Sequence, residues 1–227
     1  MNNLVHHPFF RKSESQQKRF LVRLALLFIG FILLSVALGY ATGWYLIPVL
    51  SITLGLSIIA PFFDIPALQK KGDLKYFSLL FLAEKPKNQR LKIHAGSLFD
   101  YYFVLDRGST PQQRKAFIMQ QFLSGLLNFI EVHQNHTPLK VRGTSYIINA
   151  RTAEKIGFKP QKTDALQLLI LSYNYFNLVV ANSLAKGKLS FPKLNRTISF
   201  EADISALIEH KASIQNLHDR LKRSQKA

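Results

Sequence analysis

The sequence predicts an α-rich α/β domain anchored by an N-terminal two-helix transmembrane hairpin. Residues 24–63 contain no acidic or basic side chain and no histidine, which is too long a run for an ordinary core helix. Further along the chain, segments with helical spacing of apolar residues alternate with shorter β-branched and aromatic segments. The net charge is +17, and basic residues flank the apolar run on both sides. These three observations favour a membrane anchor followed by one domain.

Residues 1–23 are predicted to form a basic cytoplasmic tail. Five cations precede the apolar run, three follow it and its centre has none: Arg11, Lys12, Lys18, Arg19 and Arg23, then Lys70, Lys71 and Lys75. By the positive-inside rule, this distribution predicts a multi-pass membrane protein with both termini cytoplasmic. The lipid bilayer, with anionic headgroups near these basic flanks, is the expected partner.

The apolar run is predicted to be a hairpin because one helix over it would be about 60 Å long, whereas the hydrocarbon core is about 30 Å thick. The stretch GYATGWY at residues 39–45 supplies glycines for a reversal and aromatic rings for the membrane–water interface. We therefore predict spans over about 24–39 and 44–63. Small residues stand four apart in each span and would let the helices approach closely: Ser35 with Gly39, and Ser51 with Gly55.

Residues 64–92 are predicted to be a juxtamembrane connector. Its apolar part, LKYFSLLFLA at residues 74–83, lies between lysines and is about half as long as a membrane span. Two placements of this part are left open. It lies in the headgroup zone, or it is the first strand or helix of the soluble domain.

Residues 93–200 are predicted to form the cytoplasmic α/β domain. Residues 93–105 resemble a strand or a bent hairpin arm, because they are rich in aromatic and β-branched residues. Residues 109–133 have the spacing of a helix, with Ser109 or Thr110 as its cap and Pro111 at its first position. A strand over 139–149 and a short helix ending near Gly157 follow.

Two further helices are predicted towards the end of the chain. Residues 164–187 are apolar enough to raise the question of a third span, but their four amide side chains favour a core helix of the domain. Residues 201–227 are predicted to be an amphipathic helix, with Leu207, Ile214 and Leu221 repeating every seven residues. This helix is expected to pack on the domain, and a homo-oligomer is left open.

Few residues suggest chemistry. The chain has no cysteine, which excludes disulfides, thiolate metal sites and a cysteine nucleophile. His94 and Asp100 could form a general-base pair only if the chain turned at Gly96, because a continuous strand would place them about 20 Å apart.

A histidine pair, His133 and His136 near Glu131, lacks further ligands at the spacing of a zinc site. Their place at a predicted helix end is typical of solvated capping residues. We therefore assign no catalytic, cofactor-binding or metal-binding residue from the sequence, and expect no cofactor.

The stretch GTSYIINARTAEKIGFK at residues 143–159 resembles the C-terminal half of the GNAT acyltransferase superfamily. In that family a helix, a strand and a short Asn-led helix ending in Lys-x-Gly-Phe follow in this order. The resemblance implies that the helix at 109–133 holds the pyrophosphate of coenzyme A at its N-terminus. It also implies roles for five residues: Arg107, Gly108 and Arg114 facing phosphates, and Asn149 and Tyr146 bordering the site.

The chain departs from that family in two ways. Its RGSTPQQR stretch holds one glycine where the family has a glycine-rich pyrophosphate loop. Residues 64–92 are also expected to leave no room for the family's front strands.

The stretches FFDIPALQKKGDLKYFSLLFLAEK, IHAGSLFDYYFVL and RGTSYIINARTAEKIGF follow the predicted hairpin. Together they resemble a family of two-span membrane proteins from Bacteroidota. This resemblance covers most of the chain, and it implies an inner-membrane address without a mechanism.

The leading functional hypothesis is a membrane-anchored adaptor or assembly factor that presents a basic cytoplasmic domain to a protein partner. The sequence shows no nucleotide-binding loop and no complete catalytic set. The alternative is a membrane-tethered, GNAT-like acyltransferase. Nucleic-acid binding is not favoured, since Lys and Arg are spread along the chain and no reader motif is present.

Overall fold

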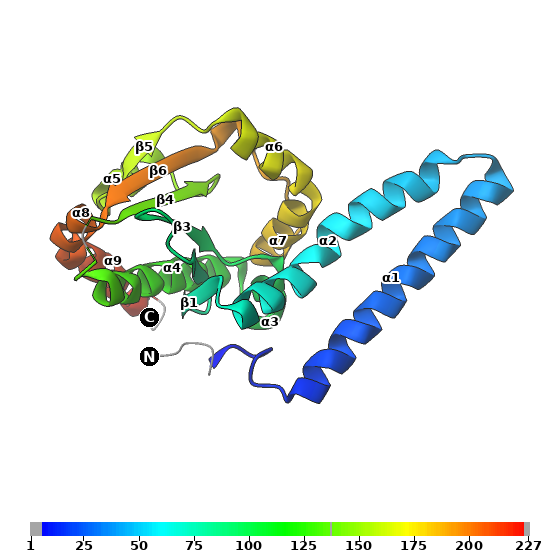
Figure 1. The fold of residues 1–227 in the computed structure, drawn as a ribbon, viewed down its shortest axis with the longest axis horizontal. Coiled ribbons are helices and arrows are strands. Elements are labelled where there is room, and N and C mark those ends of the chain that lie inside the picture. The colour runs from blue at the N-terminus through cyan, green and yellow to red at the C-terminus, as the bar shows by residue number, and fades with distance from the viewer. Residues whose placement is uncertain (1–5, 137, 225–227) are drawn as a thin grey trace.

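The computed structural model describes residues 6–136 and 138–224. A helical hairpin, α1 (Glu14–Thr42) and α2 (Leu46–Lys71), projects from a mixed α/β domain (Figure 1). Both helices are long and apolar enough to cross a membrane. The predicted fold class, an α/β domain with an apolar N-terminal hairpin, is therefore confirmed.

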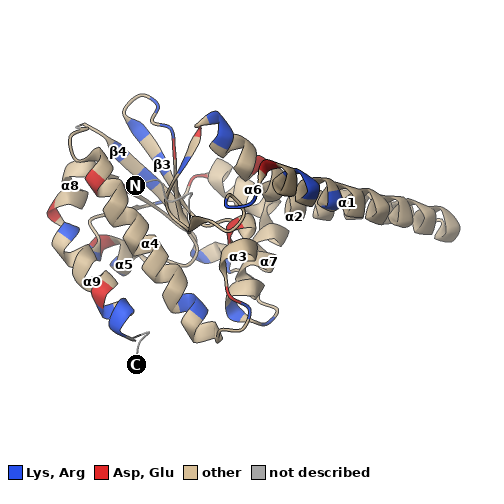
Figure 2. Cartoon of the chain, turned by 90° about the horizontal axis from the view of Figure 1, so that it is seen from below, with Lys and Arg blue, Asp and Glu red and all other residues tan. Residues whose placement is uncertain are grey.

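The hairpin helices extend beyond the predicted spans of 24–39 and 44–63. Ser13 caps α1 by accepting a hydrogen bond from the backbone N–H of Gln16, so the helix begins within the basic flank. The reversal occurs at Gly43, whose φ of 73° is favourable for glycine. Figure 2 shows that the outer part of both helices carries no charged residue.

The two helices touch at a predicted small residue. A Cβ added to Gly55 would lie 2.2 Å from the edge of the Phe28 ring, so this ring packs directly on the glycine. Ser35, on the opposite helix, is buried. The expectation that small residues allow close approach holds at these positions.

Six strands form one sheet in the order β1-β2-β3-β4-β6-β5. Their bounds are β1 (Leu74–Ser78), β2 (Phe81–Glu84), β3 (Arg90–Ala95), β4 (Lys140–Ser145), β5 (Lys159–Gln161) and β6 (Ile198–Asp203). All neighbouring pairs are antiparallel except β3 and β4, which are parallel. The crossover from β3 to β4 passes through two helices.

Seven α-helices accompany this sheet within the described residues. They are α3 (Leu98–Val104), α4 (Pro111–His133), α5 (Ala150–Lys155), α6 (Ala165–Tyr173), α7 (Tyr175–Lys186), α8 (Ile204–Glu209) and α9 (Lys211–Ser224), with a 3₁₀ turn at Leu194–Arg196. Thr110 caps α4 and Pro111 opens it, as predicted.

The segment at 74–83 lies in the sheet as β1 and β2, so residues 64–92 are not a connector. Residues 64–71 complete α2, and the predicted domain boundary at residue 93 falls inside β3. Both faces of the first two strands are covered, and almost every residue in them is buried. That burial removes the alternation of polar and apolar residues by which a half-exposed strand is identified.

Two other predicted elements differ from the structure. Residues 93–105 begin as β3 but continue as α3, because Ser97 and Asp100 form a capping box that starts a helix. Residues 201–203 are the end of β6, which lies between β4 and β5, so the helical part of the C-terminus begins at Ile204.

The basic tail is not simply a solvated segment. Its first five residues lie outside the described range, but His7 and Phe9 are fully buried. Phe9 packs in a cluster with Phe62 of α2 and Phe99 of α3, with ring centroids 5.0 Å apart between Phe9 and Phe99. The residues before α1 therefore attach the base of the hairpin to the domain.

The main core lies between one face of the sheet and α4, α8 and α9. Phe81, Leu126 and Phe129 are completely or almost completely buried there. A Cβ on Gly125 would lie 2.2 Å from the Phe81 Cβ, so α4 sits unusually close to the strands. This core is separate from the Phe9 cluster at the base of the hairpin.

The predicted helix at 164–187 is broken at Asn174. Its two parts, α6 and α7, are bent by 68° relative to each other. Figure 1 shows them between the hairpin and the sheet, with α7 beside α2. The segment is neither one straight core helix nor one straight span.

Candidate functional site

The parallel strands β3 and β4 pair briefly and then separate. Their register runs from Arg90 opposite Lys140 to Lys92 opposite Arg142. Beyond these residues β3 continues to pair with β2, while β4 continues to pair with β6. Open α/β sheets bind ligands at the carboxyl ends of parallel strands, where neighbouring strands part. A cavity of about 620 Å³ lies at this point.

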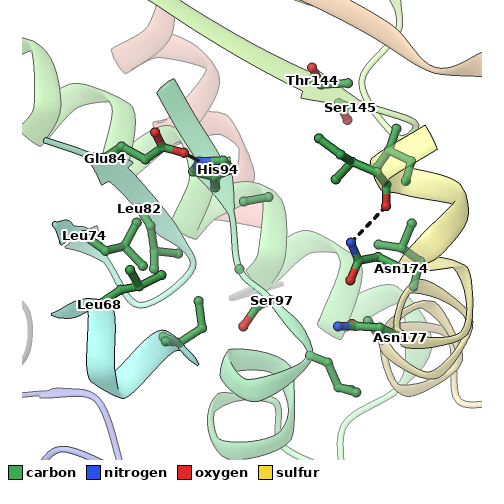
Figure 3. Close-up of a pocket in the computed structure, with 18 of the residues that line it drawn as sticks. Leu68, Leu74, Leu82, Glu84, His94, Ser97, Thr144, Ser145, Asn174 and Asn177 are labelled. Atoms are coloured by element: carbon green, nitrogen blue, oxygen red, sulfur yellow. Dashed lines mark hydrogen bonds and ion pairs between the residues drawn. The ribbon is translucent and has the colours of Figure 1, made fainter. Parts of the chain in front are cut away.

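Two kinds of surface line this cavity (Figure 3). Apolar side chains come from the end of α2 and from α6 and α7: Ile65, Leu68, Ile170, Leu171, Leu178 and Ala181. Polar side chains come from strand ends, the start of α3 and the α6–α7 bend: Glu84, His94, Ser97, Thr144, Ser145, Asn174 and Asn177. A volume of this size, lined by both apolar and polar side chains, suits an amphiphilic small molecule.

Glu84 and His94, which both line the cavity, form a pair on the neighbouring strands β2 and β3. The distance between Glu84 Oε1 and His94 Nε2 is 2.8 Å. The hydrogen bond to His94 lowers the pKa of the Glu84 carboxyl below its usual value. A carboxylate that holds one imidazole nitrogen orients the ring, which is what a general base requires.

Two tyrosines line the same cavity, Tyr101 and Tyr146. Burial raises the pKa of Tyr146 to about 12, and burial also raises the pKa of Tyr101 well above its ordinary value. Both phenols therefore keep their protons at neutral pH. Each can donate a hydrogen bond to an oxygen of a bound molecule.

The predicted pairing of His94 with Asp100 does not occur. The chain does turn near Gly96, as that pairing required, but His94 pairs with Glu84. Asp100 is fully buried and accepts hydrogen bonds from the Tyr76 hydroxyl and from Ser97. Its role is structural, at the base of the hairpin.

The second histidine pair shows no metal geometry. His133 is buried, and one of its ring nitrogens lies 2.9 Å from the carbonyl oxygen of Phe129. Glu131 points to Lys211, with 3.2 Å between Oε1 and Nζ. Within residues 6–136 and 138–224, no cluster of three or more His, Asp or Glu side chains could hold a metal ion.

The residues implied by the acyltransferase resemblance are not all brought together. Tyr146 lines the cavity, and Asn149 is close in sequence but caps α5. Arg114 lies with Asp106 around a separate pocket of about 280 Å³. Arg107 stacks over the Tyr102 ring at 5.1 Å, and the backbone N–H of Gly108 donates to Asp106.

Sequence reasoning did not identify Glu84, Asn174 or Asn177 as residues of one site. Glu84 ends β2, whereas Asn174 and Asn177 are at the bend between α6 and α7, far along the chain from it, and only the fold brings them to one cavity. One signal was present, namely amide side chains in an otherwise apolar helix. It was used to argue against a third span and not to locate a cavity.

Comparisons of the chain with protein-family models, with curated proteins and with solved structures found no match.

Proposed function

We propose that this protein is a membrane-tethered, acyltransferase-like enzyme whose domain lies on the cytoplasmic face of a bacterial inner membrane. The observation that carries the proposal is the cavity between the separating ends of β3 and β4, next to the end of α2. An acyl chain fits against its apolar side chains from α2, α6 and α7, and a polar head or thioester fits against its polar side chains from the strand ends. The basic residues at both ends of the hairpin support the cytoplasmic orientation.

The cavity holds groups that suit acyl transfer. An amine or hydroxyl acceptor attacks the carbonyl carbon of an acyl thioester, the carbon–sulfur bond breaks and the thiol leaves. His94, oriented by Glu84, accepts the proton of the attacking group and returns it to the departing thiolate. The protonated phenols of Tyr101 and Tyr146 donate to the oxygen that gains negative charge.

The structure also removes one objection to the acyltransferase resemblance. Residues 64–92 were expected to leave no room for the family's front strands, yet β1, β2 and β3 occupy residues 74–95. Helix α4, strand β4 and the Asn149-capped helix α5 then follow in the order that the family shows. The single-glycine loop at 107–114 still departs from the family, so any phosphate contacts differ.

The test is release of free thiol from acyl-coenzyme A by the full chain in lipid vesicles. Because the protein has no cysteine, a thiol reagent detects only coenzyme A. Vesicles containing phosphatidylethanolamine supply an amine acceptor, and those containing lysophospholipid supply a hydroxyl. We expect Leu171→Trp, which fills the cavity, to lower the rate at least tenfold.

The matched control is Leu168→Trp. This residue is on the same helix but does not line the cavity, so its variant should keep the rate of the unsubstituted chain. The proposal fails if no thiol is released with short or long acyl chains and either acceptor. It also fails if Leu171→Trp is as active as the control.

A membrane-anchored adaptor or assembly factor is the second candidate. One observation favours it. The acyltransferase resemblance implies that Arg107 and Arg114 face phosphates of the cofactor, but neither residue lines the cavity. Crosslinking in native membranes, followed by mass spectrometry, tests it. A single protein crosslinked reproducibly to the domain, together with no thiol release, is the result expected of an adaptor.

A further inference from the structure

Helix α6 exposes an apolar surface that the domain does not use. None of its residues is buried. Four large apolar side chains on it are more than two-fifths exposed: Leu166, Leu169, Ile170 and Tyr173. The segment from residue 165 to residue 185 contains no charged residue. A contiguous exposed apolar surface of this kind marks an interaction site.

The end of α6 is joined to the middle of a candidate membrane span. The Ser57 hydroxyl, on α2, donates a hydrogen bond of 3.4 Å to the backbone carbonyl of Tyr173. Ser57 is 3% exposed, so this contact is internal. The C-terminal end of α6 therefore lies against α2.

The depth of this contact follows from helix geometry. Trp44 and Tyr45 stand at the outer turn, where aromatic side chains meet the membrane–water interface. With a rise of about 1.5 Å per residue, Ser57 lies about 16 Å along α2 from Leu46. The hydrocarbon core is about 30 Å thick, so Ser57 lies near its middle. The Tyr173 carbonyl, bonded to Ser57, lies at a similar depth.

The bend at Asn174 has the internal hydrogen bonds to backbone carbonyls that a lipid environment requires. A broken helix frees backbone carbonyls, and inside a bilayer these must be satisfied by the protein itself. Asn174 Nδ2 donates to the carbonyl of Ile170 at 2.9 Å, and Ser57 donates to that of Tyr173. The Ile170 carbonyl, one turn before the break, also accepts the backbone N–H of Asn174, whereas the Tyr173 carbonyl at the break has Ser57 as its side-chain donor.

The two ends of the segment carry charges. Lys162 and Asp164 precede α6, while Lys186 and Lys188 are at the end of α7 and just beyond it. The bend of 68° between the two helices rules out one straight span and is found both in broken spans and in re-entrant segments. Cations at both ends are favourable next to anionic headgroups.

We propose that α6 lies in the hydrocarbon of the leaflet nearest the domain, as one arm of a re-entrant element whose exposed face contacts lipid acyl chains. Ile170, Leu171 and Asn174 also line the cavity, so the cavity has a wall at the lipid boundary. If the proposed acyl transfer is correct, its acceptor is a membrane amphiphile that enters sideways from this leaflet. That last statement rests on the proposed function, whereas the placement of α6 does not.

The absence of cysteine makes single-cysteine labelling direct. Leu166→Cys and Leu169→Cys place a bimane fluorophore on α6 of the full chain in phosphatidylcholine vesicles. Leu50→Cys on α2 is the lipid-facing control. Val132→Cys on α4 is the matched control on the domain, since Val132 is 45% exposed and Leu50 is 57% exposed.

We expect doxyl-labelled phosphatidylcholine to quench the α6 labels as strongly as the Leu50 label, and several-fold more than the Val132 label. Aqueous iodide should show the opposite order. Quenching of the α6 labels by iodide, at the level of Val132, would overturn the proposal. So would protection from both quenchers together with a Leu169→Cys disulfide between two copies, which would assign this face to a self-interface. None of these outcomes depends on thiol release, so the two proposals can fail separately.

Discussion

His7 and Asp100 face each other in a completely buried contact, with 3.3 Å between His7 Nε2 and Asp100 Oδ1. His7 Nδ1 accepts the backbone N–H of Phe9, so a neutral ring carries its proton on Nε2, towards the carboxylate. The Tyr76 hydroxyl donates to the same carboxylate oxygen. The N-terminal segment, the first strand and α3 are therefore connected through one carboxylate.

Asp100→Asn should destabilise the protein by about 1–3 kcal/mol, because the amide cannot accept hydrogen bonds at both of its polar atoms. Chemical unfolding of the full chain in detergent, followed by circular dichroism, measures the change. Asp106→Asn is the control, since Asp106 is exposed in a loop and should change stability by less than about 0.5 kcal/mol. Equal effects of the two substitutions would contradict the assigned role of Asp100.

Three tyrosines should resist ionisation in the folded protein. Burial raises the pKa values of Tyr76 and Tyr101 far above the ordinary value of about 10, and that of Tyr146 to about 12. Because the folded pKa values exceed the unfolded ones, their contribution to stability is complete below pH 10. It is lost as the pH rises beyond that.

Tyrosinate absorbance, recorded together with circular dichroism, tests this expectation. Three of the eight tyrosines should ionise later than the rest, at or after alkaline unfolding. The control is the same titration of the protein unfolded in denaturant, in which all eight tyrosines should ionise near pH 10. Complete ionisation by pH 10.5 in a protein that is still folded would refute it.

The close approach of α4 to the sheet makes Gly125 sensitive to any side chain. Gly125→Ala should cost about 1–3 kcal/mol, because the new methyl group meets the Phe81 Cβ and neither element can move freely. A Cβ added to Gly30 on α1 would have no neighbour within 4 Å. Gly30→Ala should therefore be neutral or stabilising by about 0.5–1 kcal/mol. The thermal unfolding midpoints of the two variants measure this difference in stability. A Gly125→Ala protein as stable as the unsubstituted chain would contradict the close packing of α4 on the sheet.

The Glu84–His94 pair should matter for reaction rate more than for stability. We expect His94→Ala to lower the rate of thiol release about 100-fold or more, and Glu84→Gln to lower it by a smaller factor. Both side chains are more than two-fifths exposed, so the unfolding free energy should change little. Unchanged rates in His94→Ala would remove this residue from the proposed chemistry.

The sequence predicted the hairpin because apolar length and flanking charge depend only on local composition. It also predicted the start of α4, since a cap and a proline occur together at Thr110 and Pro111. The hairpin turn between β2 and β3 was not predicted. Asn88 and Gln89 there both have positive φ without a glycine, so the usual turn signal was missing.

The cavity could not have been predicted from these local patterns. It exists because β3 separates from β4 after three register pairs, which depends on how distant strands are ordered in the sheet. The capping box of Ser97 and Asp100 was visible in the sequence. The aromatic residues around it favoured a strand, and their packing against Phe9 and Phe62 explains their presence in a helix.

The most direct test of the central claim is photocrosslinking of an acyl-chain probe to the full chain in vesicles. A fatty acyl-coenzyme A carrying a diazirine near the end of its chain is irradiated, and the modified residues are located by mass spectrometry. The account predicts crosslinks at Leu171, Leu178 and Ile65, which are apolar residues lining the cavity. They should disappear in Leu171→Trp and persist in Leu168→Trp. Crosslinks confined to outward-facing residues of the hairpin such as Leu50, with none in the cavity, would contradict it.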